Sequence, residues 1–310
     1  MYKNNLLACV LRNASVGRDS KVFATLPVGD ETLTYGQLWD NSRKVAGALV
    51  GAGVMPGDRV AVQVEKSLAA LELYLGTILA GGVHLPLNTA YTPNELDYFL
   101  GDAEPKVFVC DTDRAGSLER IAAKAGVSRV FTLTPDGLGS LTDAVEAASA
   151  IPRAIPRERD DLAAILYTSG TTGRSKGAML THGNLASNAQ VLTGYWHFTD
   201  KDVLIHALPI FHTHGLFVAT NVALTAGASL IYHTKFDAAA ILADFARATT
   251  LMGVPTFYTR LLDMPKLTKK AAAGMRLFIS GSAPLLAETH VQWQERTGKA
   301  ILERYGMTET

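Results

Sequence analysis

The residues best suited to chemistry form one run, 167–177, which reads Tyr-Thr-Ser-Gly-Thr-Thr-Gly-Arg-Ser-Lys-Gly. Glycines allow close approach of the backbone, hydroxyl groups donate hydrogen bonds, and arginine and lysine supply positive charge. This set suits a polyphosphate and predicts ATP binding. The predicted contacts are Thr168, Ser169, Gly170, Thr171, Thr172, Gly173, Arg174, Ser175 and Lys176.

Two other interpretations of this run are weaker. Its composition is also that of a flexible linker, but a linker has no reason to hold two basic residues among its glycines. The spacing from Gly170 to Lys176 does not fit G-x-x-x-x-G-K-[ST], so kinase or GTPase chemistry by the P-loop route is disfavoured.

Three histidines, His206, His212 and His214, lie within nine positions and invite a metal-site interpretation. Spacings of six and two do not put all three on one side of a strand or helix, and no cysteine or acidic cluster accompanies them. A metal site is therefore disfavoured. For His206, a satisfied core histidine remains an alternative to a role in binding.

The elements that must position these residues are strands and helices in alternation. The apolar run before Tyr167 predicts a buried strand, so that the phosphate-binding loop leaves a strand's carboxyl end, where open α/β sheets hold ligands. Expected strands are 59–64, 106–110, 129–133, 161–167, 202–208, 229–233, 251–254, 276–280 and 300–304. Helical stretches are expected at 68–80, 118–125, 216–226, 238–248 and 286–297, with an amphipathic segment at 184–192.

This rhythm predicts an α/β fold of two lobes, each a mostly parallel sheet flanked by helices. The 310 residues are enough for two lobes of roughly 150 residues each. The connection 144–155 and the charged run 157–161 place the boundary between lobes 1–156 and 157–310. The histidine segment and residues 280–284 then fall at carboxyl ends of strands, on the same rim as the phosphate loop.

Composition excludes several classes of partner. Zero formal net charge and a pI near 7.1 give no electrostatic basis for binding nucleic acid or an anionic membrane surface. Cys9 and Cys110 form neither a disulfide framework nor a zinc site, which suits a reducing compartment. The apolar start is too brief for a membrane span. A cytoplasmic location is expected, with the mitochondrial matrix as an alternative, and the sequence does not indicate an oligomeric state.

Four ordered segments resemble the adenylate-forming superfamily, which includes acyl-CoA synthetases, luciferases and adenylation domains. They are the run 167–177, His206-Ala-Leu-Pro-Ile-Phe-His-Thr-His-Gly215, Ile279-Ser-Gly-Ser-Ala-Pro284 and Arg304-Tyr-Gly-Met-Thr-Glu-Thr310. Together with Leu85–Tyr91 and Gly253–Arg260, they are most similar to malonyl-CoA synthetases. The resemblance covers nearly the whole chain and implies the large N-terminal domain of that fold.

The resemblance implies roles for individual residues. Lys176 would hold the β- and γ-phosphates, Thr308 the α-phosphate, and Glu309 a magnesium ion, with Thr171 as a further metal contact. His212 would form a wall of the acyl pocket, and Tyr305 would stack on adenine, with a core aromatic as the alternative. The further nucleotide contacts implied are Ser282, Ala283, Pro284, Glu303, Arg304, Gly306 and Met307.

A dicarboxylate substrate has a second negative end that needs a partner, and arginine is suited to it because its planar fork binds a carboxylate through two bonds. Arg304 and Arg260 are the candidates, with a surface ion pair as the alternative for each. Ser282 would add a hydroxyl contact, and His206 and His212 would line the pocket. Arg276 is a weaker candidate, because relatives that use uncharged acids also have a basic residue there.

The function implied is an ATP-dependent ligase that converts malonate, or a substituted malonate, to malonyl-AMP and then to malonyl-CoA. ATP and magnesium are the expected cofactors and coenzyme A the co-substrate, with neither nucleic acid nor a membrane as partner. Alternatives are a general acyl- or aryl-CoA synthetase, a carrier-loading adenylation domain, and a nucleotide-binding module without turnover. The last follows because the chain stops at Thr310, where such enzymes continue into a mobile C-terminal domain, so a truncated enzyme is expected.

Overall fold

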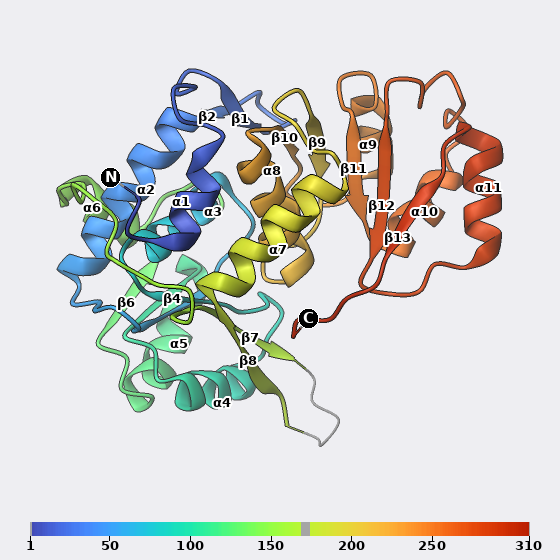
Figure 1. Ribbon diagram of the computed structural model, residues 1–310. Helices are drawn as coiled ribbons and strands as arrows, with labels where there is room; N and C mark the ends of the chain where they lie inside the picture. The colour runs from blue at the N-terminus through green and yellow to red at the C-terminus, as the bar shows by residue number, and fades with distance from the viewer. Residues whose placement is uncertain (1, 169–173, 310) are drawn as a thin grey trace. The chain divides into compact units, whose positions relative to one another are not determined.

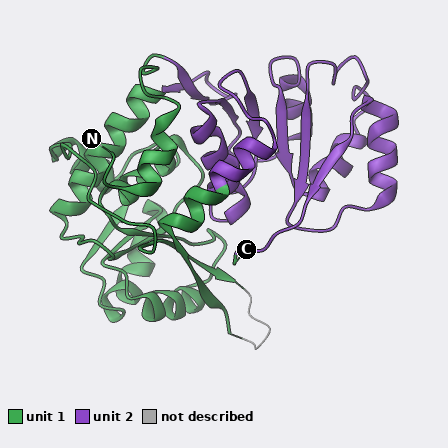
Figure 2. Ribbon diagram, viewed as in Figure 1, with its two compact units in different colours: residues 1–20, 35–188, 309 green, residues 21–34, 189–308, 310 purple. Residues whose placement is uncertain are grey.

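The computed structural model describes residues 2–168 and 174–309. Contacts within the chain define two compact units, coloured separately in Figure 2. Unit 1 contains residues 2–20, 35–188 and 309, and unit 2 contains residues 21–34 and 189–308. This division differs from the expected boundary at residue 156, because two strands after that point belong to the first sheet.

Unit 1 contains a six-stranded sheet in the described part of the chain (Figure 1). Its strands are β3 (Arg59–Gln63), β4 (Val83–Pro86), β5 (Val107–Cys110), β6 (Arg129–Thr132), β7 (Leu162–Thr168) and β8 (Lys176–Thr181). They lie in the order β6-β5-β3-β4-β7-β8, all parallel except β8, which is antiparallel to β7. Strands β4 and β5 are buried throughout, as expected for parallel strands covered on both faces.

The helices of unit 1 bury their apolar sides against this sheet and against one another. They are α1 (Leu6–Asn13), α2 (Tyr35–Gly51), α3 (Leu68–Leu79), α4 (Pro93–Ala103), α5 (Thr112–Lys124) and α6 (Ser140–Ala147). Helix α2 packs on α3 and α6, and α4 packs on α5. Helix α4 begins with a capping box, in which Thr92 and Glu95 bond each other's backbone N–H, and Pro93 takes the first helical position.

Unit 2 contains a seven-stranded sheet among its described residues. Its strands are β1 (Val22–Thr25), β2 (Thr32–Thr34), β9 (Val203–His206), β10 (Ser229–Tyr232), β11 (Thr250–Gly253), β12 (Leu277–Gly281) and β13 (Ile301–Arg304). The order is β13-β12-β11-β9-β10-β1-β2, parallel except for the β1–β2 hairpin. Because β1 pairs with β10, residues from near the start of the chain complete the sheet of the second unit.

The helices of unit 2 connect these parallel strands. They are the π-helix η1 (His214–Thr220), α8 (Asn221–Ala226), α9 (Ala238–Asp244), α10 (Pro255–Leu262) and α11 (Ala287–Thr297). Helix α7 (His182–Tyr195) begins in unit 1 and ends in unit 2. Helix α10 packs on α9 and α11. Helix α11 ends at Thr297 and is capped by Gly298, whose φ of 70° is a left-handed conformation that favours glycine.

The predicted α/β class is confirmed, and each strand expected after residue 58 is present to within a few residues at each end. The alternation of apolar and amphipathic segments was therefore a sound guide. The sequence analysis did not predict β4, the hairpin β1–β2, strand β8, or the helices α2, α4 and α10. The stretch 144–155, expected as a connection, begins inside α6.

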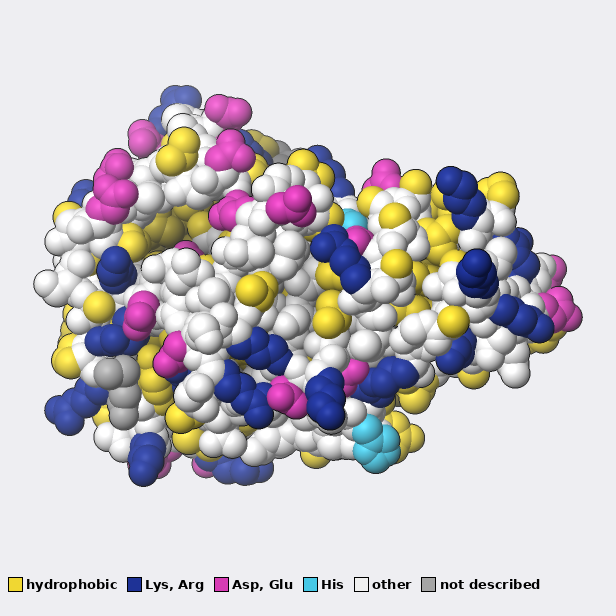
Figure 3. All heavy atoms as spheres, turned by 90° about the horizontal axis from the view of Figure 1, so that it is seen from above, with side chains coloured by type: hydrophobic (Ala, Val, Ile, Leu, Met, Phe, Trp, Pro, Cys, Tyr) yellow, Lys and Arg dark blue, Asp and Glu magenta, His cyan; other side chains and the backbone are white. Residues whose placement is uncertain are grey.

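Charged side chains of both signs are interspersed over the face of the molecule in Figure 3, in keeping with the zero formal net charge. Among the described residues, no helix is both long and apolar enough to cross a membrane.

Candidate functional site

The described ends of the predicted phosphate-binding run belong to two antiparallel strands. Tyr167 and Thr168 end β7, and Lys176 begins β8, where it pairs with Thr168. A Cβ atom on Gly177 would meet Ile165 Cγ2 at 2.8 Å, so glycine is needed for β8 to pass β7 this closely. Five of the predicted ATP contacts lie outside the described residues: Ser169, Gly170, Thr171, Thr172 and Gly173.

Helix α4 supports both of these strands. Tyr98 Oη donates a hydrogen bond of 2.8 Å to the carbonyl of Ser175, and Tyr167 Oη donates one of 2.6 Å to the Asp102 carboxylate. Burial and the Asp102 carboxylate raise the pKa of Tyr167, so its hydroxyl stays protonated and remains a donor. The sequence analysis assigned no supporting role to Tyr98 or Tyr167, because that role is visible only once α4 is placed beside β7.

Two cations of the run are available for a ligand. The Arg174 guanidinium lies 5.8 Å from the centre of the Tyr98 ring, a cation–π distance, and Lys176 is exposed at the start of β8. Neither side chain makes a hydrogen bond or ion pair with any residue that the structure describes.

Glu309, predicted as a magnesium ligand, is grouped with unit 1. Its Oε1 accepts a hydrogen bond of 3.2 Å from Thr168 Oγ1, at the end of β7. The described residues contain no cluster of three or more histidine, cysteine or acidic side chains that could hold a metal. A single carboxylate fits the habit of magnesium, which uses one or two protein carboxylates together with phosphate oxygens and water.

In unit 2, His214 and Ser282 form the best-defined polar pair at the carboxyl ends of the strands. His214 is 5% exposed and its Nδ1 lies 3.1 Å from Ser282 Oγ. Burial, with a smaller contribution from the positive charge of Arg304, lowers the pKa of His214 to about 4. Ser282 follows β12 with φ of 70°, a left-handed conformation that is costly for a residue other than glycine and often marks functional sites.

This pair resembles the nucleophile and base of a hydrolase, but its details disfavour that chemistry. Among the described residues no group hydrogen-bonds His214 Nε2, so the third member of such a triad is missing. A pKa of about 4 also makes His214 a weak base at neutral pH.

Arg304 is the second notable cation of unit 2. It ends β13, where it pairs with Gly281, and it is half-buried. Its guanidinium packs over Gly306, whose added Cβ would meet Arg304 Cζ at 3.3 Å. Burial lowers the pKa of Arg304. No described residue forms a hydrogen bond or an ion pair with its guanidinium. A partly desolvated guanidinium without a counter-ion is suited to bind a carboxylate or phosphate.

The three histidines have three different environments. His206 is fully buried, and its Nε2 lies 2.9 Å from the Gly215 carbonyl and 3.2 Å from Thr220 Oγ1. This favours the satisfied core histidine over the predicted role in the acyl pocket. His212 is exposed beside the Phe211 ring, at 4.6 Å between centroids. The sequence analysis considered His214 only as part of the cluster, but His214 contacts Ser282, a predicted binding residue.

The motif at 303–308 has mixed environments. Tyr305 is 87% exposed, which excludes a core aromatic and leaves its ring free to stack on a base. The carboxylate of Glu303 instead accepts a hydrogen bond of 3.0 Å from Leu285 N, so it holds the turn after β12. Thr308 Oγ1 lies 3.5 Å from Thr213 Oγ1.

The remaining predicted residues are exposed to solvent or paired. Ala283, Pro284 and Met307 are exposed. Arg260 is also exposed on α10, with its guanidinium 5.7 Å from the centre of the Phe236 ring. Arg276 is committed to Asp202 in a two-bond ion pair, so a role in binding a substrate is not supported for it.

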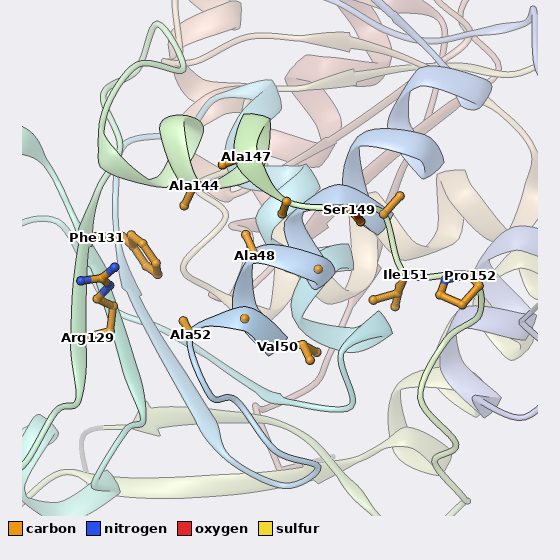
Figure 4. A pocket seen from close by; sticks show the side chains of 14 residues that line it. Ala48, Val50, Ala52, Arg129, Phe131, Ala144, Ala147, Ser149, Ile151 and Pro152 are labelled. Atoms are coloured by element: carbon orange, nitrogen blue, oxygen red, sulfur yellow. The ribbon is translucent and has the colours of Figure 1, made fainter.

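A hollow of about 630 Å³ lies within unit 1 (Figure 4). Small side chains of α2 and α6 line it, with Arg129 and Phe131 of β6 on one side. No residue predicted to bind a nucleotide or an acid contributes to it.

The fold and the site segments define a class of protein: the chain belongs to the AMP-binding enzyme family, whose model matches residues 11–310. Among solved structures it is similar to apo MatB from Rhodopseudomonas palustris, with 58% identity and a TM-score of 0.95 over 99% of this chain and 60% of that one. An ATP-bound form of MatB from the same organism matches with 59% identity, the same TM-score and the same coverage.

Relatives known by sequence are more distant. A malonate–CoA ligase from Arabidopsis thaliana is 33% identical over 84% of this chain and 46% of its own length. A feruloyl-CoA synthase from an Amycolatopsis species is 35% identical over 91% of this chain and 55% of its own length. The chain therefore spans about half the length of these relatives.

Proposed function

We propose that this chain carries the nucleotide- and acid-binding part of an ATP-dependent ligase that joins malonate to coenzyme A. The observation that carries the proposal is Arg304, a half-buried guanidinium without an anionic partner among the described residues. A dicarboxylate presents a second negative end, and an unmatched buried charge costs roughly 3–5 kcal/mol. The similarity to a malonate–CoA ligase and to MatB supports the same assignment.

The proposed reaction has two steps. A carboxylate oxygen of malonate attacks the α-phosphorus of ATP, and the bond to pyrophosphate breaks. The coenzyme A thiol, losing its proton, then attacks the carbonyl carbon of malonyl-AMP, and AMP leaves. The first step needs no nucleophile from the protein, so catalysis consists of positioning the two substrates and neutralising phosphate charge.

The proposed roles follow from the side chains. Lys176 and Arg174 bind the β- and γ-phosphates, and the Thr308 hydroxyl binds the α-phosphate. Arg304 binds the carboxylate that does not react. Glu309 would hold magnesium, which supplies further neutralisation of phosphate charge when bound.

Two further contacts complete the proposed site. The exposed Tyr305 ring stacks on adenine, and the Ser282 hydroxyl donates to a malonate carboxylate. His212 remains a proposed wall of the acyl pocket. One added methyl group changes binding by only about 1–3 kcal/mol, so substituted malonates belong to the same proposal.

The nucleotide part is tested by calorimetry on the 310-residue chain with magnesium-ATP. Lys176→Ala is expected to weaken binding about tenfold or more, because a charge-assisted hydrogen bond contributes roughly 1.5–3 kcal/mol. Lys201→Ala, another exposed lysine, is the matched control and should bind as the parent does. Equal effects of the two variants would contradict the assignment of Lys176.

The acid part is tested by binding malonate, acetate and benzoate in the presence of magnesium-ATP, alongside pyrophosphate release. Malonate is expected to bind at least tenfold more tightly than acetate, since only malonate offers Arg304 a second carboxylate. A response confined to monocarboxylates would overturn the malonate assignment.

A second candidate is an aryl-CoA synthetase, favoured by the similarity to a feruloyl-CoA synthase. Tight binding of aromatic acids, with no response to malonate, would support it. Binding of ATP and malonate without pyrophosphate release would support a binding module without turnover. The cytoplasmic location stays a prediction from the sequence.

A further inference from the structure

The hydrogen bond between His214 and Ser282 raises the question of which group donates. Nδ1 and Oγ lie 3.1 Å apart, and His214 Nε2 has no hydrogen-bond partner among the described residues. Because burial keeps the ring neutral at physiological pH, only one of its two nitrogens carries a hydrogen. The choice of nitrogen decides what the serine hydroxyl can do.

If the hydrogen were on Nε2, a buried N–H would have no acceptor, which is rare and costs free energy. Nδ1 would then accept the Ser282 hydroxyl hydrogen. Ser282 Oγ would offer only lone pairs to a ligand, and these repel a carboxylate.

If the hydrogen is on Nδ1, the ring donates to Ser282 Oγ, and Nε2 is an acceptor without a hydrogen. Leaving this acceptor unpaired costs less free energy than leaving a buried N–H unpaired. The Ser282 hydroxyl hydrogen is then free. Ser282 is exposed, so its hydroxyl can reach a bound acid.

The backbone fixes this geometry. A Cβ atom on Gly281 would lie 3.2 Å from His214 Cε1, so the imidazole packs closely over the glycine. The left-handed conformation of Ser282, with φ of 70°, then sets the position of its Oγ. At the end of the neighbouring strand, Arg304 lies opposite Gly281 in the β12–β13 register, so a cation and a hydroxyl are available to one acid.

We propose that His214, in the tautomer with its hydrogen on Nδ1, is a positioning residue that turns the Ser282 hydroxyl hydrogen toward a carboxylate of the acid substrate. The proposal rests on the proposed function, since it assumes an acid beside Ser282. It assigns His214 a role in binding the acid and none in binding the phosphates.

The binding test uses calorimetry of the 310-residue chain with malonate in the presence of magnesium-ATP. His214→Ala and Ser282→Ala are each expected to weaken malonate about tenfold, and the double variant no more than either alone, because both remove one hydrogen bond. His214→Asn keeps an N–H donor near the place of Nδ1 and should bind within about threefold of the parent. ATP affinity should change less than twofold in all of them.

Additive losses, of about a hundredfold in the double variant, would overturn the proposal. So would a His214→Asn variant as weak as His214→Ala, or equal losses for ATP and malonate. A merely structural role for His214 would lower the melting temperature without these malonate-specific effects.

The tautomer itself is tested by ¹⁵N NMR of the chain labelled at histidine, with His214→Asn used to assign the signal. The proposal expects a protonated Nδ1 and a bare Nε2, and the reverse pattern overturns it. This measurement needs no substrate. If malonate fails to bind the parent chain, the proposed function fails, and the NMR result decides the tautomer on its own.

Discussion

In the sheet of unit 2, one arginine lies at the amino ends of the strands and another at the carboxyl ends. The first is paired with a carboxylate, and the second is not paired with any described residue. Arg276 immediately precedes β12, and Arg304 ends the neighbouring parallel strand β13. Arg276 Nε lies 2.7 Å from Asp202 Oδ1, and Arg276 Nη2 lies 2.8 Å from Asp202 Oδ2. Arg304 has no such partner among the described residues.

The difference shows that one residue type has two kinds of environment in the same sheet. At the amino end, the fork of Arg276 is satisfied by a buried carboxylate and by the carbonyls of Trp196 and His197, so it ties loops together. At the carboxyl end, where open α/β sheets bind ligands, the Arg304 guanidinium is half-buried and unpaired among the residues that the structure describes. The first arrangement serves stability, and we propose that the second serves binding.

The largest effect is expected from Arg276→Leu. Asp202 is 4% exposed, and the substitution leaves its buried carboxylate without a cation, with only the hydrogen bonds from Thr199 and Thr249. We expect a loss of about 3 kcal/mol in the free energy of unfolding, measured with urea, and little change in malonate affinity. Arg247→Leu is the control, because Asp244 keeps its hydrogen bond to His233, and it should lose less than about 1 kcal/mol. Equal losses would break the comparison.

Arg304→Gln should show the reverse pattern. We expect malonate affinity to fall about a hundredfold, close to 2.7 kcal/mol, while the free energy of unfolding stays the same or rises, since no contact with an anion is lost. Calorimetry with malonate and with ATP, beside urea unfolding, measures both. A comparable loss for the two ligands would place Arg304 outside the acid site.

The two ends should also differ in their pH dependence. The pKa of His214 is about 4 in the folded chain, below its usual value near 6.5, so its contribution to stability is complete above pH 6.5 and is lost as pH falls toward 4. We expect the stability difference between the parent and His214→Asn to change by about 2–3 kcal/mol over this range. The parent should gain stability relative to the variant as the pH rises. A stability difference that does not change with pH would contradict the lowered pKa of His214.

Asp202 acts in another range. Burial alone would raise its pKa, but hydrogen bonds from Arg276, Thr199 and Thr249 outweigh burial and hold it below the usual value. Its contribution to stability is therefore present above about pH 4 and lost below it. The contribution of the Arg276–Asp202 ion pair to stability should consequently stay constant between pH 4 and 6.5.

The smallest effect is expected from Ser282→Gly. Glycine adopts φ of 70° without strain, so we expect a gain of about 0.5–1 kcal/mol in the free energy of unfolding. Malonate affinity should fall about tenfold, because the hydroxyl is lost. Ser282→Ala loses the same hydroxyl but keeps the strained φ. The difference in stability between the two variants therefore measures the cost of the left-handed conformation.

The sequence predicted the parallel framework well because apolar strands and amphipathic helices have a regular spacing. It also singled out Arg304 and gave Arg276 lower weight. The ion pair of Arg276 with Asp202 supports that lower weight, and the role of Arg304 in binding an acid stays a prediction. It did not indicate the support of Ser175 by Tyr98 or the bond between His214 and Ser282. Both interactions join residues far apart in sequence. The positive φ of Ser282 could not be predicted either, because serine does not usually adopt it.

Strand β8 was missed for a local reason. Its six residues, Lys176–Thr181, are only partly buried and follow a glycine-rich run, so no apolar period of two marks them. The strand predicted before the run is nevertheless confirmed, since β7 ends at Thr168. The contacts of Ser169 to Gly173 with ATP stay predictions.

The hairpin β1–β2 has a consequence for how the chain is made. Lys21 Nζ bonds the carbonyl of Gly227, a residue 206 positions away, and β1 pairs with β10. At synthesis rates of 5–20 residues per second, the hairpin leaves the ribosome roughly 10–40 s before its partner strand exists. A gene fragment starting after residue 188 would leave the edge of β10 bare and prone to aggregate, so a fragment designed to fold as unit 2 must encode residues 21–34.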